Sequence, residues 1–403
     1  MKNLVVEIEK MDHFGRGIGK VNGKTIFIEN ALIGEIVEAM IIKEKKNFME
    51  GKTVKYIKKS VNRVDAICPY FTICGGCDVM HLTYDEQLKY KENKLKEILK
   101  KFANFENVKN IVSSNELYYR NKVTLQVKET IGYFKKKSYN IIPIDKCLIA
   151  DKRINDLIKL LKNINLFGIN QIVIRTSYDE IMVVFHLNED VSVNIASFDI
   201  VDTIISIYNK KQKILKGKGY ITTKIGDLNF KISPTSFFQV NNLGMELLYN
   251  KVVEYGNFTK NDMVLDLYCG TGTIGIFMAQ HCKNVFGIEI NDEAISDALI
   301  NKKINNIENI DFKAGDVGTV LKETNFYPNV IVVDPPRAGL DNNAINKINE
   351  LKPDRLIYVS CDPVTLARDL NILKEKFNII EVTPVDMFPN TYHVESVALL
   401  KLK

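Results

Sequence analysis

One cysteine lies between a segment that predicts a strand and a segment that predicts a helix. Cys361 follows the apolar run Leu356 to Ser360 and precedes Asp362 and Pro363. Proline suits the first turn of a helix, and helix-terminal amides favour a thiolate over a thiol. The alternative for an isolated cysteine is a buried structural residue. The context therefore predicts that Cys361 is reactive and can serve as a nucleophile.

A glycine-containing loop, Asp266 to Gly272, follows another hydrophobic segment and opens a helix. In an open parallel sheet, ligands bind beyond the carboxyl ends of the strands, where glycines such as Gly270 let the backbone approach the ligand. Glu289 ends the next predicted strand, at the spacing of an acidic residue that binds ribose hydroxyls. This pattern leaves a nicotinamide site open, but the third glycine of that fingerprint is displaced. The arrangement looks more like that of an S-adenosylmethionine enzyme.

Two more acidic residues end predicted strands at the same edge. Asp316 is a candidate contact to the adenosine side of a cofactor, with helix capping as an equal alternative. Asp334 is followed by Pro335 and Pro336, which fix a rigid, non-helical exit from the strand. We therefore expect Asp334 to lie at the edge of the active site.

A reactive thiol beside a methyl donor indicates one kind of chemistry. C5 of uracil is a poor nucleophile, and a thiolate that adds to C6 generates an enolate that can attack a sulfonium methyl group. The adduct must then lose its C5 proton to a base. Glu395 lies among apolar residues of the last predicted strand, Val394 to Leu400, where desolvation would raise its pKa. His393 is the alternative base.

Four other cysteines are spaced as metal ligands. Cys68, Cys74 and Cys77 lie close together, and Cys147 lies far downstream. The chain has seven cysteines, and an odd number in a long chain argues against a disulfide framework. Four thiolates suit either zinc or an iron-sulfur cluster, and the spacing leaves both open.

The composition is that of an ordinary globular protein. The 403 residues, 46% hydrophobic and 26% charged, suffice for two or three domains with their own cores. No apolar run approaches the roughly 20 residues of a membrane-spanning helix, and Met1 to Asp12 lacks the apolar block of a signal peptide. We therefore expect a cytoplasmic protein. A net charge of +6 permits a polyanionic partner, although a basic run such as Lys52 to Lys59 is by itself typical of a solvated face.

The first half of the chain divides into three kinds of segment. Residues 1–59 hold short alternating strands with glycine-rich turns, a pattern typical of small oligonucleotide-binding barrels. Residues 84–102 carry apolar side chains on one helical face, which predicts an amphipathic helix. Strands dominate residues 112–232, and we expect them to form an antiparallel middle domain.

After residue 234 the chain alternates strands with helices, which predicts a doubly wound, mostly parallel sheet. This sheet would place the ends of its strands, and with them the reactive residues, along one edge. The last two predicted strands, 379–385 and 394–400, are joined by a short loop. Because a parallel crossover needs a longer connection, this pair should be antiparallel.

Together these motifs resemble the RNA uracil-C5 methyltransferases, which methylate uridines in 23S ribosomal RNA and in the T-loop of transfer RNA. The resemblance covers nearly the whole chain, and its motifs are a TRAM-like barrel in residues 1–59, Ser236 to Asn241, Asp266 to Gly272, Asp334 to Arg337, Ser360 to Pro363 and Asp386 to Ser396. It implies an α/β Rossmann-like class I methyltransferase domain at residues 236–403. It also implies a strand-rich central domain at residues 60–235 with an iron-sulfur site, in which residues 80–111 would pack on the catalytic domain.

The resemblance further implies roles by position. Cys361 matches the nucleophile of the family and Glu395 matches its base. The matches to S-adenosylmethionine and active-site positions are Gln239, Tyr268, Glu289 and Asp334. In the larger ribosomal-RNA members, the pattern of Cys68, Cys74, Cys77 and Cys147 holds a [4Fe-4S] cluster, so we expect one here. We expect the protein to bind RNA, foremost 23S ribosomal RNA. We expect no association with a membrane and no obligatory protein partner, and we expect the protein to be a monomer.

Other functions remain open to the sequence. Transfer RNA is the alternative substrate. A cytosine-C5 RNA methyltransferase would carry an extra cysteine beside Asp334, and a base-amino methyltransferase would carry an aromatic residue where Arg337 stands. From a different class, an RNA-binding scaffold with a silent methyltransferase fold would retain RNA affinity without forming a covalent adduct.

Overall fold

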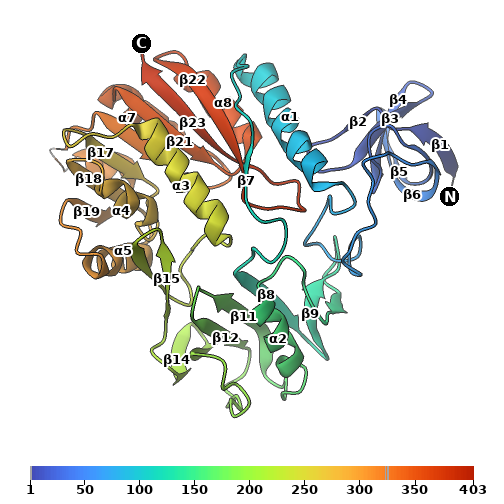
Figure 1. Ribbon diagram of the computed structural model, residues 1–403, viewed down its shortest axis with the longest axis horizontal. Coiled ribbons are helices and arrows are strands. Elements are labelled where there is room, and N and C mark those ends of the chain that lie inside the picture. Colours follow the sequence, from blue (N-terminus) through green and yellow to red (C-terminus); the bar gives the residue numbers. More distant parts are fainter. Residues whose placement is uncertain (1, 323, 325) are drawn as a thin grey trace.

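The computed structural model describes residues 2–322, 324 and 326–403, so Met1, the first residue of the predicted barrel, lies outside the description. A small barrel, a central sheet and a larger α/β body make up the molecule (Figure 1). The barrel lies at one end, beside helix α1 (Tyr84–Ala103). No helix among the described residues is both long and apolar enough to cross a membrane.

The predicted N-terminal barrel is present. Its six strands, β1 (Asn3–Glu7), β2 (Lys10–Met11), β3 (Gly17–Val21), β4 (Lys24–Glu29), β5 (Ile36–Glu44) and β6 (Phe48–Lys58), pair in the order β1-β5-β6-β4-β3-β2. Alternate side chains such as Val6, Ile26 and Ile28 point inward and form its core, as the strand period of two requires. Gly19 lets β3 approach β1 closely, because a Cβ there would lie 2.3 Å from the Glu7 carbonyl oxygen.

A seven-stranded sheet forms the central body. It contains β8 (Lys122–Val127), β9 (Ile131–Phe134), β10 (Ile141–Pro143), β11 (Ile169–Thr176), β12 (Ile181–Leu187), β13 (Thr203–Tyr208) and β14 (Lys211–Lys216). Helix α2 (Lys152–Leu161) packs on it and shares its core. The prediction of an antiparallel sheet is wrong for one pair, because β12 and β13 run parallel. Residues 188–202 join them, a connection longer than the dozen or so residues that a parallel crossover needs.

The C-terminal body is built on an eight-stranded sheet with the order β19-β18-β17-β20-β21-β23-β22-β7. Its strands are β7 (Val112–Ser113), β17 (Met263–Leu267), β18 (Asn284–Glu289), β19 (Ile310–Ala314), β20 (Val330–Val333), β21 (Arg355–Ser360), β22 (Phe377–Asp386) and β23 (Glu395–Leu402). The strands pair in parallel except at β23, which is antiparallel to β21 and β22. The predicted doubly wound sheet with an antiparallel end pair is therefore confirmed.

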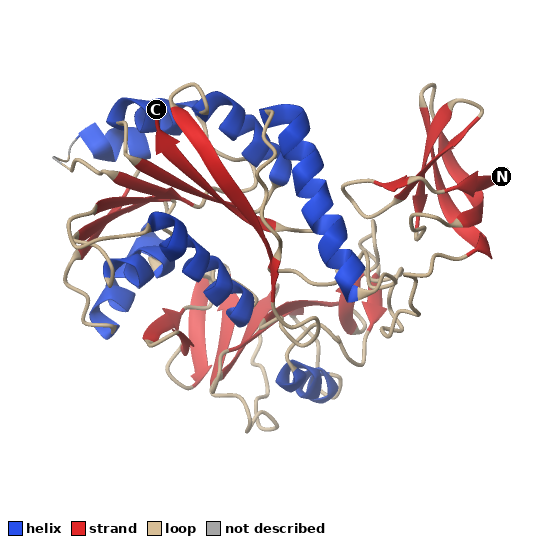
Figure 2. Ribbon diagram, turned by 45° about the horizontal axis from the view of Figure 1, so that its top comes forward, coloured by secondary structure: helices blue, strands red, loops and turns tan. Residues whose placement is uncertain are grey.

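Helices cover both faces of this sheet (Figure 2). One face carries α3 (Asn242–Gly256), α4 (Thr273–Ala279) and α5 (Asp292–Ile304), and shares its core with the hairpin β15 (Ile221–Ile225) and β16 (Leu228–Ile232). The other face carries α6 (Val317–Lys322), α7 (Asn342–Leu351), α8 (Pro363–Leu373) and α1. Leu95 and Leu99 of α1 share a buried core with Leu366 and Leu370 of α8. A helix from the first quarter of the chain thus completes the C-terminal body.

Candidate active site

Cys361 lies at the carboxyl end of β21, between a buried strand and helix α8. Asp362 caps α8 by accepting hydrogen bonds from the backbone amides of Val364 and Thr365 at 2.9 and 3.0 Å. Pro363 begins the helix, as predicted for a first turn. The cap fixes the direction of the chain after Cys361 and leaves its side chain half-buried at the strand end.

Glu395 begins β23, which lies directly beside β21. Ser360 pairs with Ser396 in this antiparallel register, so the next positions along the two strands, Cys361 and Glu395, are neighbours. Glu395 is only 4% exposed. The sheet therefore brings together the two residues that the sequence predicts as nucleophile and base.

Asp334 follows β20, the strand between β17 and β21. Its backbone amide donates a hydrogen bond to the Leu267 carbonyl oxygen at 3.3 Å, which ties the end of β20 to the end of β17. The strand order places the Asp266 to Gly272 loop, Asp334, Cys361 and Glu395 at the ends of four successive strands. Groups that are far apart in the sequence thus form one row along the sheet edge.

Burial governs protonation in this row. It raises the pKa of Glu395 to about 8, with a further contribution from the negative charge of Asp334, and it raises the pKa of Asp334 to about 7. Burial, followed by the charges of Glu395 and Asp334, raises the pKa of Cys361 to about 12, while the Arg337 guanidinium acts in the opposite direction. The sequence considered only the helix terminus, which favours the thiolate, whereas burial and the two carboxylates raise the pKa of this thiol.

The loop after β17 reverses direction through residues with positive φ. Tyr268, Gly270 and Gly272 have φ of 63°, 53° and 76°, so Tyr268 occupies a conformation that side-chain-bearing residues rarely adopt. The Gly270 amide donates to Glu289 Oε2 at 3.2 Å, and the Asn291 amide donates to Glu289 Oε1 at 3.0 Å. A Cβ on Gly270 would meet no atom within 4 Å. The loop and Glu289 therefore border open space, as a cofactor site requires.

The two remaining candidate cofactor residues are Asp316 and Gln239, and each accepts a hydrogen bond. Asp316 follows β19 and accepts a hydrogen bond from the Thr319 amide at 3.1 Å, so it makes the capping contact that the sequence left open as an alternative. Gln239 lies in the segment between β16 and α3, where its backbone carbonyl accepts from Asn121 Nδ2 at 3.2 Å. Gln239 is thus held by the central body as well as by the C-terminal one.

A cavity of about 510 Å³ extends from the spaced cysteines to Arg337 and the segment between β22 and β23. Its lining includes Cys68, Cys74, Cys77 and Cys147 on one side, and Arg337, Phe388, Thr391 and His393 on the other. Arg120 and Lys146 add positive charge to its wall. Sequence reasoning missed these two residues, because they stand in irregular segments that match no motif.

The four spaced cysteines are free thiols around this cavity. The Gly76 amide donates to Cys74 Sγ at 3.4 Å, and the Cys147 amide donates to Asn155 Oδ1 at 2.7 Å. In the part of the chain that the structure describes, no three candidate ligands are arranged as a site for one metal ion. The cysteines therefore share a cavity without forming a preassembled single-ion site.

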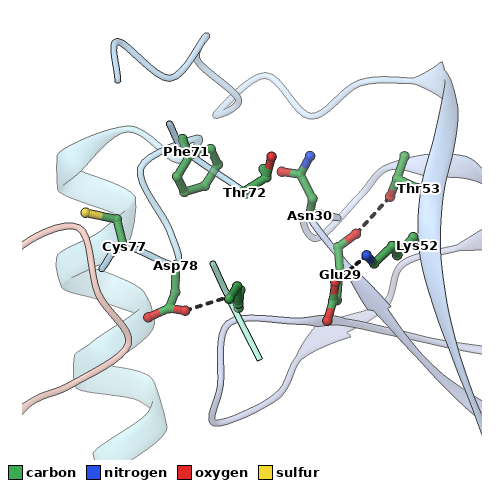
Figure 3. Close-up of a pocket in the computed structure, with 9 residues that line it drawn as sticks. Glu29, Asn30, Lys52, Thr53, Phe71, Thr72, Cys77 and Asp78 are labelled. Carbon is green, nitrogen blue, oxygen red and sulfur yellow. Dashed lines mark hydrogen bonds and ion pairs between the residues drawn. The ribbon is translucent and has the colours of Figure 1, made fainter. Parts of the chain in front are cut away.

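The barrel meets the cysteine segment across a smaller cavity of about 190 Å³ (Figure 3). Asp78, next to Cys77, pairs with Lys136 at 3.0 Å. Lys137 crosses to the barrel, where it pairs with Glu29 at 2.7 Å. The Cys77 sulfur points away from the barrel residues in Figure 3. Polar contacts thus dock the barrel, as is common between domains.

Known proteins match this chain over almost its whole length. Residues 83–403 match the family described as tRNA (Uracil-5-)-methyltransferase, and residues 2–54 match the TRAM domain. Two relatives, named as uncharacterized RNA methyltransferases, come from Clostridium tetani and Clostridium acetobutylicum. The first is 38% identical over 96% of this chain and 93% of the relative, and the second is 39% identical over 98% and 96%. Among solved structures, Pyrococcus abyssi tRNA (uracil-54, C5)-methyltransferase in complex with S-adenosyl-L-homocysteine is 30% identical, with a TM-score of 0.81 over 98% of this chain and 100% of that chain.

Proposed function

Because the chain belongs to the tRNA (uracil-5-)-methyltransferase family, we propose that it transfers a methyl group from S-adenosylmethionine to C5 of a uridine in RNA. The observation that carries this proposal is the pairing of β21 with β23, which makes Cys361 and Glu395 neighbours. Asp334 and the cofactor loop end the next two strands along the same edge. In this proposal, the nucleophile, the base and the methyl donor act on one pyrimidine ring at this edge of the sheet.

Cys361 acts as the nucleophile in this proposal. Its proton passes to the Asp334 carboxylate, which removes one of the charges that raise the thiol pKa and leaves Glu395 free to accept a proton later. The sulfur then bonds to C6 of uracil, and the electrons of the C5–C6 double bond move toward the C4 carbonyl oxygen, which makes C5 nucleophilic. Bound S-adenosylmethionine supplies an electrophilic methyl group. Glu395 finally takes the proton from C5, the double bond re-forms, and the Cys361 thiolate leaves C6.

The rate of C5 proton release should rise with pH up to about 8. Glu395 must be ionised to accept the proton, and burial raises its pKa to about 8, so the rate should fall about tenfold per pH unit below that value. Burial lowers the pKa of His393 to about 4, so a reaction with His393 as base would not change with pH near neutrality. Tritium release from [5-³H]uridine RNA in single turnovers measures this rate. A profile that stays flat between about pH 6 and 9 would assign the base to His393.

S-adenosylmethionine would be held by the residues that border the open space in front of the β17 loop. These are Gln239, Tyr268, Gly270, Glu289, Asp316 and Asp334. The Glu289 carboxylate accepts one backbone amide on each oxygen and retains lone pairs for ribose hydroxyls. The donor set therefore fits a nucleoside, with Glu289 as its anchor.

We further propose that Cys68, Cys74, Cys77 and Cys147 hold a [4Fe-4S] cluster. Four free thiols around one cavity supply the ligand number and type that such a cluster requires. Zinc is the alternative metal. The cluster would act structurally, because its ligands belong to the wall of the cavity and not to the reactive row.

Cys74→Ala is expected to lose most of the bound iron and to lower protein solubility before it alters methyl transfer by the soluble fraction. One of four thiolate ligands is removed, and the other three cannot complete the cluster. Iron and zinc per chain, measured by plasma mass spectrometry after anaerobic purification, test this result. Cys282→Ala is the matched control, because Cys282 is buried beside α4 and donates to the Met278 carbonyl oxygen. Zinc in place of iron in the unaltered protein would contradict the proposal.

The proposed target is 23S ribosomal RNA, since the four cysteines resemble those of ribosomal-RNA members of the family. Transfer RNA is the second candidate, favoured by the similarity to an archaeal enzyme named for uracil-54 of tRNA. The TRAM barrel and the cationic Arg120 and Lys146 would contact the RNA backbone. We propose that the protein acts as a cytoplasmic monomer with no obligatory protein partner.

Two measurements test the proposed function. The protein should form a covalent complex with RNA containing 5-fluorouridine, because fluorine at C5 cannot leave as a proton. RNA binding without this complex would indicate a scaffold. Mass-spectrometric mapping of 5-methyluridine in 23S ribosomal RNA and transfer RNA from a deletion strain should then reveal a missing methyl group in 23S ribosomal RNA. A loss confined to transfer RNA would reassign the substrate.

A further inference from the structure

The loop between β22 and β23, residues 387–394, leads directly to Glu395 and carries part of the cavity wall. Phe388, Thr391 and His393 line the large cavity beside Arg337. Loops that connect strands are usually exposed and mobile. Here Met387, Pro389 and Asn390 are buried. An unusual amount of the loop is therefore held inside the protein.

Donors from distant segments bind the backbone carbonyls of this loop one after another. The carbonyl oxygen of Met387 accepts from Asn241 Nδ2 at 3.1 Å, and that of Pro389 accepts from the Tyr119 hydroxyl at 3.0 Å. Two lysines of α1 donate to the loop: Lys91 Nζ to the Phe388 carbonyl and Lys94 Nζ to the Tyr392 carbonyl, both at 2.9 Å. The Asn390 carbonyl accepts from the backbone amides of Asp78 and Val79 at 2.9 and 3.1 Å. Each bond removes a degree of freedom that a loop of this length would otherwise keep. The loop is consequently fixed from four separate parts of the chain.

Helix α1 contributes the buried part of this network. Lys91 Nζ lies 2.5 Å from Asp386 Oδ1 at the end of β22, and both side chains are fully buried. The Tyr84 hydroxyl donates to the other oxygen of Asp386 at 3.0 Å. Gln87, one helix turn before Lys91, forms two hydrogen bonds with Asn390, called the amide pair here. The backbone amide of Asn390 donates to Gln87 Oε1 at 2.9 Å, and Gln87 Nε2 donates to Asn390 Oδ1 at 3.3 Å.

The buried polar contacts between α1 and the loop are not needed to pack α1 against the sheet. A buried ion pair is often no more stabilising than apolar residues of similar volume, and Leu95 and Leu99 already anchor α1 to the sheet. Asn390 has a φ of 66°, a strained conformation for a residue with a side chain, and its amide pair with Gln87 helps to hold it. The polar groups of α1 thus fix the position of the loop and contribute little to the stability of the packing between α1 and the sheet.

We propose that α1 positions the catalytic loop, with Lys91 and Gln87 as positioning residues for the reaction. The inference rests on the proposed function. Lys91 and Gln87 hold both ends of the segment 386–390, so that His393 and Phe388 stay on the cavity wall and Glu395 enters β23 facing Cys361. The S-adenosylmethionine loop lies on the far side of β20 and has no part in this network.

Gln87→Met is the principal test, because it removes the amide pair without leaving a buried charge. Single-turnover methylation at saturating RNA and S-adenosylmethionine is expected to fall about 10- to 100-fold, the range that follows from a displacement of about 1 Å. The dissociation constant for S-adenosylmethionine should not change. Lys91→Met should act in the same direction, and Lys89→Met is the matched control, because Lys89 lies on the same helix but points to solvent and pairs with Glu86.

Circular dichroism and thermal melting establish whether each variant is folded. If Lys91→Met does not fold, Gln87→Met decides the question. A folded Gln87→Met protein that methylates at the unaltered rate, or that loses rate and S-adenosylmethionine affinity together, would overturn the positioning role. Failure of the unaltered protein to form an adduct with 5-fluorouridine RNA would instead refute the proposed function, so the two failures are distinguishable.

Discussion

Cys361→Ala is expected to abolish methyl transfer, with a loss of about 10⁴-fold or more. Without the sulfur, no bond forms at C6, and C5 remains too weak a nucleophile to attack a methyl group. Cys361 lies half-buried at a strand end, outside the packed core, so its removal should leave the fold intact. Transfer of a labelled methyl group to RNA measures the loss. Denaturing electrophoresis of mixtures with 5-fluorouridine RNA should show no covalent complex.

Cys282→Ala serves as the control for this variant as well. It removes a thiol of the same C-terminal body without touching the row of strand ends, and methylation should continue. Binding of S-adenosylmethionine to Cys361→Ala should also persist, because the β17 loop and Glu289 are unaltered. Measurable turnover by Cys361→Ala would exclude Cys361 as the nucleophile, and adduct formation by Cys269 or another thiol would relocate the chemistry.

Glu395→Gln is expected to permit the addition of Cys361 to uracil and to block its release. Glutamine has nearly the shape of the protonated glutamic acid that predominates at neutral pH, because burial raises the Glu395 pKa to about 8. The variant should therefore fold. It cannot accept the C5 proton, so turnover should fall about 10²- to 10⁴-fold. A covalent complex should accumulate on RNA that contains ordinary uridine, where the unaltered enzyme shows little.

Glu381→Gln is the control for Glu395→Gln. Glu381 lies on β22 and pairs with Lys109 at 2.8 Å, away from the row of strand ends, so turnover should be unaffected. Rapid product release by Glu395→Gln would show that another group takes the proton. His393→Gln would then be the variant to measure, because His393 stands on the cavity wall close to the same end of β23.

Much of the fold follows from the sequence because strand and helix periodicities are local. The alternation after residue 234 predicts the doubly wound sheet, and the short connection before Val394 predicts its antiparallel end. Other features depend on distant contacts. β7 has only two residues, Val112 and Ser113, and becomes a strand by pairing with β22. Helix α3 has a weak helical pattern in the sequence, because its apolar residues lie on more than one side and it contains Gly244.

The candidate site is predictable to the extent that it consists of strand ends. Glu289 and Glu395 are terminal residues of recognisable strands, and Asp334 and Cys361 directly follow such strands. The sheet brings these positions to one edge. The protonation of Cys361 is not predictable in this way, because it depends on carboxylates that only the folded sheet brings near. Arg120, Lys146 and the hydrogen bonds that fix residues 387–394 likewise arise from contacts between separate bodies.

The contact between helix α1 and strand β22 has a consequence for folding during synthesis. Lys91 and Asp386 are 295 residues apart in the chain. At about 5–20 residues per second, a ribosome needs roughly 15 to 60 seconds to make that stretch. During this interval the apolar face of the newborn helix has no sheet to cover it. The C-terminal body can therefore fold only after its last strands have been synthesised, and until then the apolar face of α1 stays exposed or is bound by a chaperone.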